Sequence, residues 1–132
     1  ALGVLDRQRV AEEVKGLELL VGVRDDPEYG PIMVFGLGGI FVEAIRDVVF
    51  RLLPVTEADV GEMIAELRGR ALFGLYRNRP EPDILALKRA VAGLSRYFAD
   101  HRRVLSDIEI NPLVVLKKGD GVRAVDIRPV WK

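Results

Sequence analysis

The sequence predicts an α+β domain in which a mainly antiparallel sheet carries two main helices. Three observations predict this class. Short apolar runs separated by turn residues occur towards both ends of the chain and indicate hairpins. Between them lie two segments whose apolar residues recur at helical spacing. No internal repeat or low-complexity linker divides the 132 residues, so they are expected to form one unit around one core.

The first predicted hairpin spans residues 17–35. Apolar and other residues alternate over 17–23, which is typical of a strand with one buried face. The segment 25–31 contains two prolines and a glycine, so the chain should reverse there, and its two aspartates are expected to cap the turn. Residues 32–35 then form the returning strand. Residues 36–39 contain three glycines and are predicted to form a loop whose backbone can approach a bulky ligand.

A second hairpin is predicted from the strands 40–45 and 48–53, closed by Pro54. Thr56 then begins a capping box and a helix that ends before Gly69.

The longer predicted helix begins at Pro82 or Asp83 and runs to Asp100. The strands 108–115 and 123–127 follow, joined by a turn rich in glycine and lysine.

The chemistry of the chain is expected on the first of these last two strands. Asp107, Glu109 and Asn111 alternate with isoleucines, so they should share one face. Side-chain oxygens suit Mg²⁺, and the returning strand would bring Asp126 beside them. A plain solvated strand face gives the same alternation. Pro112 favours the metal site, because a proline cannot donate to the ladder and pairing should end beside the asparagine.

Composition limits the possible partners. Lys plus Arg and Asp plus Glu balance at 20 each, so no net field favours nucleic acid or an anionic membrane. The absence of Cys excludes disulfides and thiolate metal sites. The apolar runs are far shorter than the roughly 20 residues that span a bilayer. We therefore expect a cytoplasmic protein that binds neither nucleic acid nor membrane.

Several blocks of sequence resemble, in order, the carboxyl-terminal part of the ATP-grasp domain of ADP-forming acyl-CoA (acetyl-CoA) synthetases. The succinyl-CoA synthetase β subunit is a relative of these enzymes. The similarity covers most of the chain, and several ordered blocks are more specific than any single motif. The blocks are 18–23, 24–31, 35–43, 47–54, 107–115 (DIEINPLVV) and 124–126 (AVD).

This resemblance implies roles for individual residues. Glu109 and Asn111 would hold Mg²⁺ on the phosphates of ATP or ADP, with Asp126 as a further ligand. Arg51 would neutralise phosphate charge, and Glu18 would lie beside the nucleotide cleft.

The same resemblance assigns two backbone segments to the nucleotide. Gly36, Gly38 and Gly39 would form a loop near the transferred phosphoryl group. Glu12 and Val14 would belong to a hinge whose backbone borders adenine.

The implied activity is that of an acid–thiol ligase, which converts acid, CoA and ATP reversibly into acyl-CoA, ADP and phosphate. Residues 1–132 would be a single partial domain, the carboxyl-terminal half, because the lobe with a phosphate-contacting lysine is not found in this chain. The expected partners are that amino-terminal lobe, a CoA-binding subunit or domain, and further copies in an oligomer. The isolated chain is expected to be inactive.

Two alternatives remain open at this point. The chain could be a non-catalytic ATP-grasp-like module of a protein acetyltransferase. It could also be a protein-interaction domain, for which an exposed apolar patch along residues 84–98 is expected.

Overall fold

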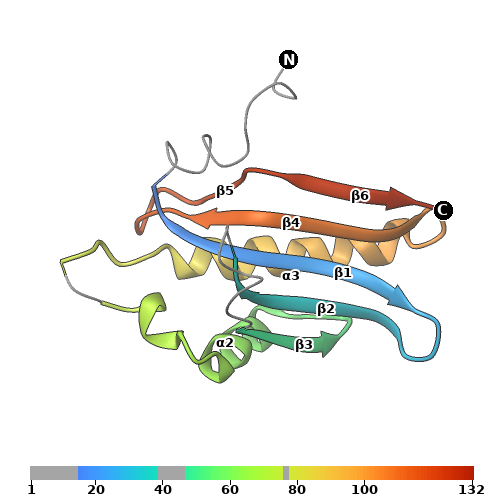
Figure 1. Cartoon of the computed structure of the whole chain (residues 1–132), viewed down its shortest axis with the longest axis horizontal. Coiled ribbons are helices and arrows are strands. Elements are labelled where there is room, and N and C mark those ends of the chain that lie inside the picture. The colour runs from blue at the N-terminus through green and yellow to red at the C-terminus, as the bar shows by residue number, and fades with distance from the viewer. Residues whose placement is uncertain (1–14, 39–46, 76–77) are drawn as a thin grey trace, which may run out of the picture.

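The computed structural model describes residues 15–38, 47–75 and 78–132, and these form one sheet with helices packed on it (Figure 1). The six strands pair antiparallel throughout in the order β3-β2-β1-β4-β5, and β6 also pairs with β4. The predicted α+β class is therefore confirmed. The strands are β1 (Leu17–Asp26), β2 (Gly30–Leu37), β3 (Val48–Leu52), β4 (Leu105–Val115), β5 (Val122–Ala124) and β6 (Ile127–Trp131). The helices are α2 (Glu57–Glu66), the 3₁₀ turn η2 (Arg70–Phe73) and α3 (Ile84–His101).

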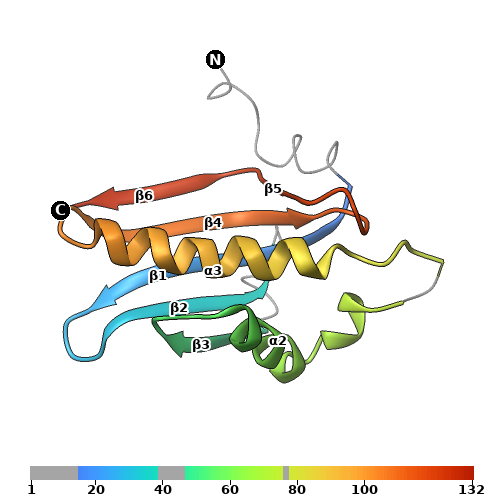
Figure 2. The same cartoon turned by 180° about the vertical axis from the view of Figure 1, so that it is seen from behind.

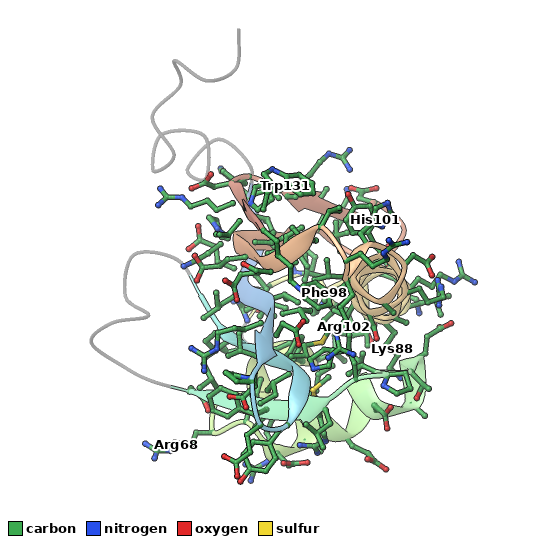
Figure 3. The ribbon with its side chains drawn as sticks, turned by 90° about the vertical axis from the view of Figure 1, so that its right-hand side faces the viewer. Arg68, Lys88, Phe98, His101, Arg102 and Trp131 are labelled. Carbon is green, nitrogen blue, oxygen red and sulfur yellow. The ribbon has the colours of Figure 1, made fainter. Side chains whose placement is uncertain are left out.

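Both α-helices cover the same face of the sheet. They lie behind the strands in Figure 1 and in front of them after the half-turn to Figure 2. Figure 3 looks along the strands and shows α3 on one side only, with Phe98 between the helix and the sheet. Among the described residues, no helix covers the other side, which we call the open face. None of the helices described is long and apolar enough to cross a membrane.

Alternation along β1 and β2 separates these two faces. Leu19, Val21, Met33 and Phe35 point to the helices and are at most 1% exposed. Each such burial contributes roughly 1.5–3 kcal/mol, which makes this layer the main source of stability. Helix α3 contributes Leu87, Val91 and Phe98 to the same hydrophobic core.

The apolar patch expected along residues 84–98 for an interaction module is not present. The larger apolar side chains of this segment mostly pack against the sheet, and the large ones still exposed are Leu85 and Tyr97. These two lie about 18 Å apart along the axis at 1.5 Å per residue, so they form no continuous surface.

Both helix starts follow the sequence prediction. Thr56 Oγ1 accepts from the Asp59 amide at 3.2 Å, and Asp59 Oδ2 accepts from the Thr56 amide at 2.8 Å, which completes the capping box. Asp83 caps α3 by accepting from the Ala86 amide at 3.1 Å. Its second oxygen accepts from Gly119 and Gly121 of the β4–β5 turn, so one carboxylate holds the helix start against that turn.

The ends of several strands differ from the prediction. β2 continues through Gly36, because this residue still pairs with Val48 of β3 and with Leu20 of β1, so the predicted loop begins later. The predicted strand 40–45 lies outside the described residues, and β3 pairs with β2.

The end of the chain is also more divided than predicted. Residues 123–127 are not one strand but parts of β5 and β6, which are separated at residues 125–126. Pairing does not end at Pro112 either. β4 runs through it, but the neighbouring strand changes there from β6 to β5, and the register against β1 shifts.

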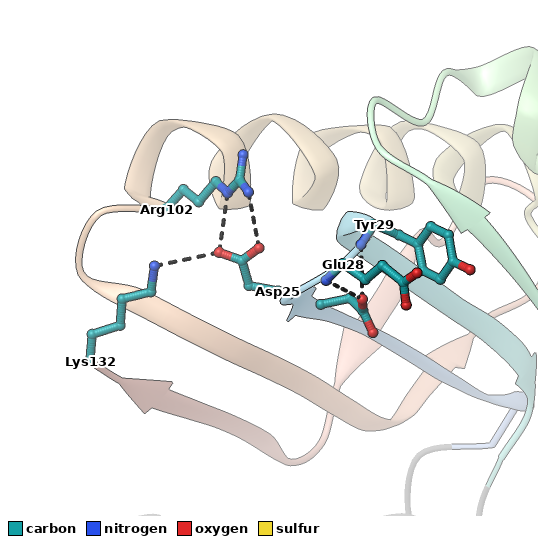
Figure 4. A network of polar contacts seen from close by, with 6 residues as sticks. Asp25, Glu28, Tyr29, Arg102 and Lys132 are labelled. Carbon is teal, nitrogen blue, oxygen red and sulfur yellow. Dashed lines mark hydrogen bonds and ion pairs between the residues drawn. The ribbon is translucent and has the colours of Figure 1, made fainter.

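An ion-pair network joins the turn after β1 to the end of α3 (Figure 4). Arg102 donates to both Asp25 oxygens at 3.1 Å, and Lys132 Nζ lies 3.4 Å from Asp25 Oδ2. Of the two aspartates expected to cap the turn, Asp26 does so, since its Oδ1 accepts from the Glu28 and Tyr29 amides. Asp25 instead binds these two cations, and Arg102 is the main reason that the pKa of its carboxyl is lowered.

The hydrogen bonds of the Asp83 carboxylate predict that part of the free energy of unfolding is lost in acid. The amide of Ala86, followed by that of Gly121, holds the pKa of Asp83 below its usual value of 3.8. A carboxyl whose pKa is lower in the folded than in the unfolded state stabilises the fold at pH values above its unfolded pKa. This contribution is lost as the pH falls through the folded pKa. We expect the stability advantage of wild type over Asp83→Asn, measured by urea unfolding, to be constant above about pH 5 and to shrink below 3.8. An advantage that grows on acidification would contradict this assignment.

Candidate functional site

Glu109 lies on the open face near the middle of β4. Its neighbours Ile108 and Ile110 pack into or against the core, so the glutamate must point the other way, and it is exposed. Gly22 of β1 is its partner on one side, and Arg128 of β6 is its partner on the other. Because Gly22 has no side chain, the sheet beside Glu109 is flat on that side.

Asn111 and Asp126 meet where β4 changes its neighbour. β4 pairs with β6 up to Ile110 and with β5 from Leu113. In the gap, the Asn111 amide donates to the Asp126 carbonyl at 3.0 Å. The break between β5 and β6 therefore places the backbone of Asp126 beside Asn111, which lies two residues after Glu109 on β4.

Arg128 is a member of this group that the sequence reasoning missed. Its Nε lies 3.2 Å from Asp126 Oδ2, and its position in β6 is directly opposite Glu109. The signal that could have found it is the spacing of two from Asp126, which puts both side chains on one face of an extended segment.

The donor set fits a hard divalent cation. Glu109 and Asp126 offer carboxylates and Asn111 offers an amide oxygen, while Mg²⁺ takes one or two protein carboxylates and fills its octahedron with phosphate oxygens and water. Within residues 15–38, 47–75 and 78–132, no group of three or more His, Cys, Asp or Glu could hold a metal. A metal held by Glu109, Asn111 and Asp126 would therefore need further oxygen ligands, such as phosphate and water.

Gly36 near the end of β2 and Gly38 just after it are required by close packing of backbone. A Cβ on Gly38 would lie 2.4 Å from the Leu19 carbonyl carbon, and a Cβ on Gly36 would lie 2.2 Å from the Asp47 carbonyl oxygen. The Gly38 amide donates to the Glu18 carbonyl at 3.0 Å, so the structure brings these two predicted residues together. This amide is already used within the fold.

Glu18 lies on the open face at the start of β1. It is four positions before Gly22, the partner of Glu109, which is about 13 Å along a strand. Glu18 therefore lies well away from Glu109 on this face. Gly39, Glu12 and Val14 lie outside the described residues.

The fold does not place Arg51 beside the other predicted site residues. It pairs across the ladder with buried Met33, so its side chain lies on the helix-covered face, and its guanidinium forms an ion pair with Glu66 of α2. Glu109 lies on the opposite face. Nearby, the buried Asp47 carboxylate accepts from the Arg68 and Gly69 amides at 2.8 and 2.7 Å, a bracing role that the sequence did not predict.

The fold is an α+β domain with an open sheet face that carries oxygen-bearing side chains. The family model for the ATP-grasp domain matches residues 3–130. The chain therefore belongs to the ATP-grasp domain family.

Curated relatives are ADP-forming CoA ligases. The chain is 37% identical over 117 residues to the acetate–CoA ligase (ADP-forming) II subunit beta of Pyrococcus furiosus, covering 89% of this chain and 50% of that protein. It is 36% identical over 120 residues to the 4-hydroxybutyrate–CoA ligase (ADP-forming) of Nitrosopumilus maritimus, covering 90% of this chain and 17% of that protein. The chain thus spans about half the length of the subunit and a much smaller share of the longer ligase.

A solved structure supports the same relationship. The dinucleotide-forming acetyl-coenzyme A synthetase 1 of Candidatus Korarchaeum cryptofilum, in complex with coenzyme A and Mg-AMPPCP, superimposes with a TM-score of 0.82 at 35% identity. The match covers 90% of this chain and 55% of that one.

The close approach at Gly38 predicts a strong effect of a single methyl group. We expect Gly38→Ala to lower the free energy of unfolding by about 1–3 kcal/mol, because the new Cβ would overlap β1 backbone that cannot move aside. Gly74→Ala is the matched control, since a Cβ there meets nothing within 4 Å. Chemical denaturation measures both, and equal stabilities of the two variants would disprove the packing argument.

Proposed function

We propose that this chain is the ATP- and Mg²⁺-binding half of an ADP-forming acyl-CoA synthetase. The reaction is the reversible conversion of acid, CoA and ATP into acyl-CoA, ADP and phosphate. The observation that carries the proposal is the position of Asp126, whose backbone bonds to Asn111 two residues after the exposed Glu109 on β4. Membership of the ATP-grasp family supports it.

In this function Glu109 and Asn111 hold the metal, and Asp126 is a further ligand. Bound Mg²⁺ neutralises charge on the phosphates, and phosphoryl transfer asks the protein mainly for positioning and charge neutralisation. Gly36 and Gly38 act by fixing the start of the segment that carries Gly39, since the Gly38 amide is bound to Glu18. Glu12 and Val14 border the base.

Arg51 takes no phosphate contact in this arrangement, because the sheet separates it from the metal ligands. Its role is to hold α2 to β3 through Glu66. Arg128, which lies on the same side as Glu109, is the cation of the described residues that stands at the site.

The partners follow from the open face. Phe50 and Leu52 of β3 are exposed there together with Glu109, and no helix of the described residues would cover a nucleotide on this face. A second ATP-grasp lobe with a phosphate-contacting lysine supplies this cover, and a CoA-binding subunit or domain completes the enzyme. Together these parts form an oligomer, and ATP or ADP with Mg²⁺ is the ligand of this half.

The uncovered face predicts weak nucleotide binding by the chain alone. We expect isothermal titration of Mg-ATP into the 132-residue chain to give little heat, and titration after addition of an amino-terminal ATP-grasp half to give saturable binding. The reason is that half of the contacts and the exclusion of water come from the second lobe. Tight, metal-dependent binding by the chain alone would refute this division of the site.

The metal ligands predict a loss of turnover without a loss of fold. In the assembled enzyme, Glu109→Ala and Asn111→Ala should each lower kcat at least about 10²-fold, the effect typical of removing a group that stabilises transition-state charge. The free energy of unfolding should change by no more than about 0.5 kcal/mol for the exposed Glu109.

Glu62→Ala is the matched control for these variants, because Glu62 is an exposed carboxylate on α2, which covers the other face. It should leave kcat unchanged. A nearly normal rate in Glu109→Ala would remove this residue from the mechanism.

A further inference from the structure

Arg128 forms an ion pair with Asp126, one of the proposed metal ligands. Its Nε is 3.2 Å from Asp126 Oδ2, and in the ladder it stands directly opposite Glu109. Residues directly opposite in an antiparallel pair have Cβ atoms about 4.5–5.5 Å apart, so the side chain of Arg128 begins close to that of Glu109.

The charges at this position explain why a cation is present. Glu109 and Asp126 both carry carboxylates, and Arg128 forms an ion pair with Asp126. In the next row of the sheet, Arg24 stands opposite Asp107.

We propose that Arg128 is a resident counter-cation that a divalent metal must displace from Asp126. This inference rests on the proposed function, because it assumes that Asp126 is a metal ligand. A guanidinium cannot lose its proton, so it leaves only by moving its side chain. Arg128 is 67% exposed at its side chain, which gives it room to do so.

Displacement makes the site discriminate against the free metal. A free metal ion can bind Asp126 only if the ion pair between Asp126 and Arg128 breaks, which leaves the Arg128 guanidinium without that carboxylate. A metal that arrives on a nucleotide brings phosphate oxygens, which a guanidinium binds as well as it binds a carboxylate. Arg128 therefore lowers the affinity for free Mg²⁺ and selects the metal–nucleotide complex. It is a specificity-determining residue whose effect is exerted through Asp126.

Free-metal binding by the 132-residue chain tests this inference without turnover. Mn²⁺ is the probe, and broadening of the backbone amide signals of Asn111 and Asp126 in ¹⁵N-correlated spectra reports where it binds. We expect Arg128→Ala to need about three- to five-fold less Mn²⁺ for half-maximal broadening, the fold-change that corresponds to an exposed ion pair of up to about 1 kcal/mol. Arg128→Lys keeps the charge and should stay close to wild type.

Arg123→Ala is the matched control. Arg123 is another arginine of this sheet region, but its guanidinium donates to the Val122 carbonyl, so its removal should leave the Mn²⁺ concentration unchanged. An unchanged concentration in Arg128→Ala, or an equal gain in Arg123→Ala, overturns the inference.

Asp126→Asn separates this failure from failure of the proposed function. If Mn²⁺ broadens signals at Asn111 in wild type and the variant loses the effect, the metal site stands whatever Arg128 does. Broadening that is centred elsewhere and is insensitive to Asp126→Asn overturns both the proposed metal site and the role of Arg128.

Discussion

The packing of apolar side chains of β1 and β2 against α2 and α3 determines which residues lie on each face of the sheet. Because a strand presents alternate residues to opposite faces, burying Leu19, Val21, Met33 and Phe35 under the helices leaves the residues between them on the open face. The ladder carries this division across to Glu109 on β4. The position of the candidate ligands is thus a consequence of hydrophobic burial on the other side of the sheet.

One irregularity on β4 converts that open face into a site. A regular ladder would keep one neighbour along the whole strand, whereas β4 changes from β6 to β5 around Asn111 and Pro112. The register against β1 also shifts at this point. The backbone of Asp126 bonds there to Asn111, and Arg128 follows two residues later opposite Glu109. A break in pairing therefore gathers acidic, amide and cationic groups from segments on either side of a turn.

Much of the fold could be predicted because its signals are local. The capping box at Thr56 and the cap at Asp83 involve residues three apart, and the helix and strand periods need no partner to be recognised. A hairpin also constrains which residues can meet, and the backbone of Asp126 does lie beside Asn111. The role of Glu109, Asn111 and Asp126 as metal ligands stays a prediction. The division of 123–127 into two strands was missed, because register depends on the neighbouring strand.

The sequence by itself determined the class of fold, the two helices, and the oxygen-bearing residues of the last strands, because these depend on residue type and spacing. Tertiary structure alone decided which face each residue joins. It turned Arg51 towards Glu66 and away from the site, and it placed Arg128 beside Asp126. The physical reason is that a charged side chain in a strand is compatible with either face, and only the packing of the helices and the strand register select one.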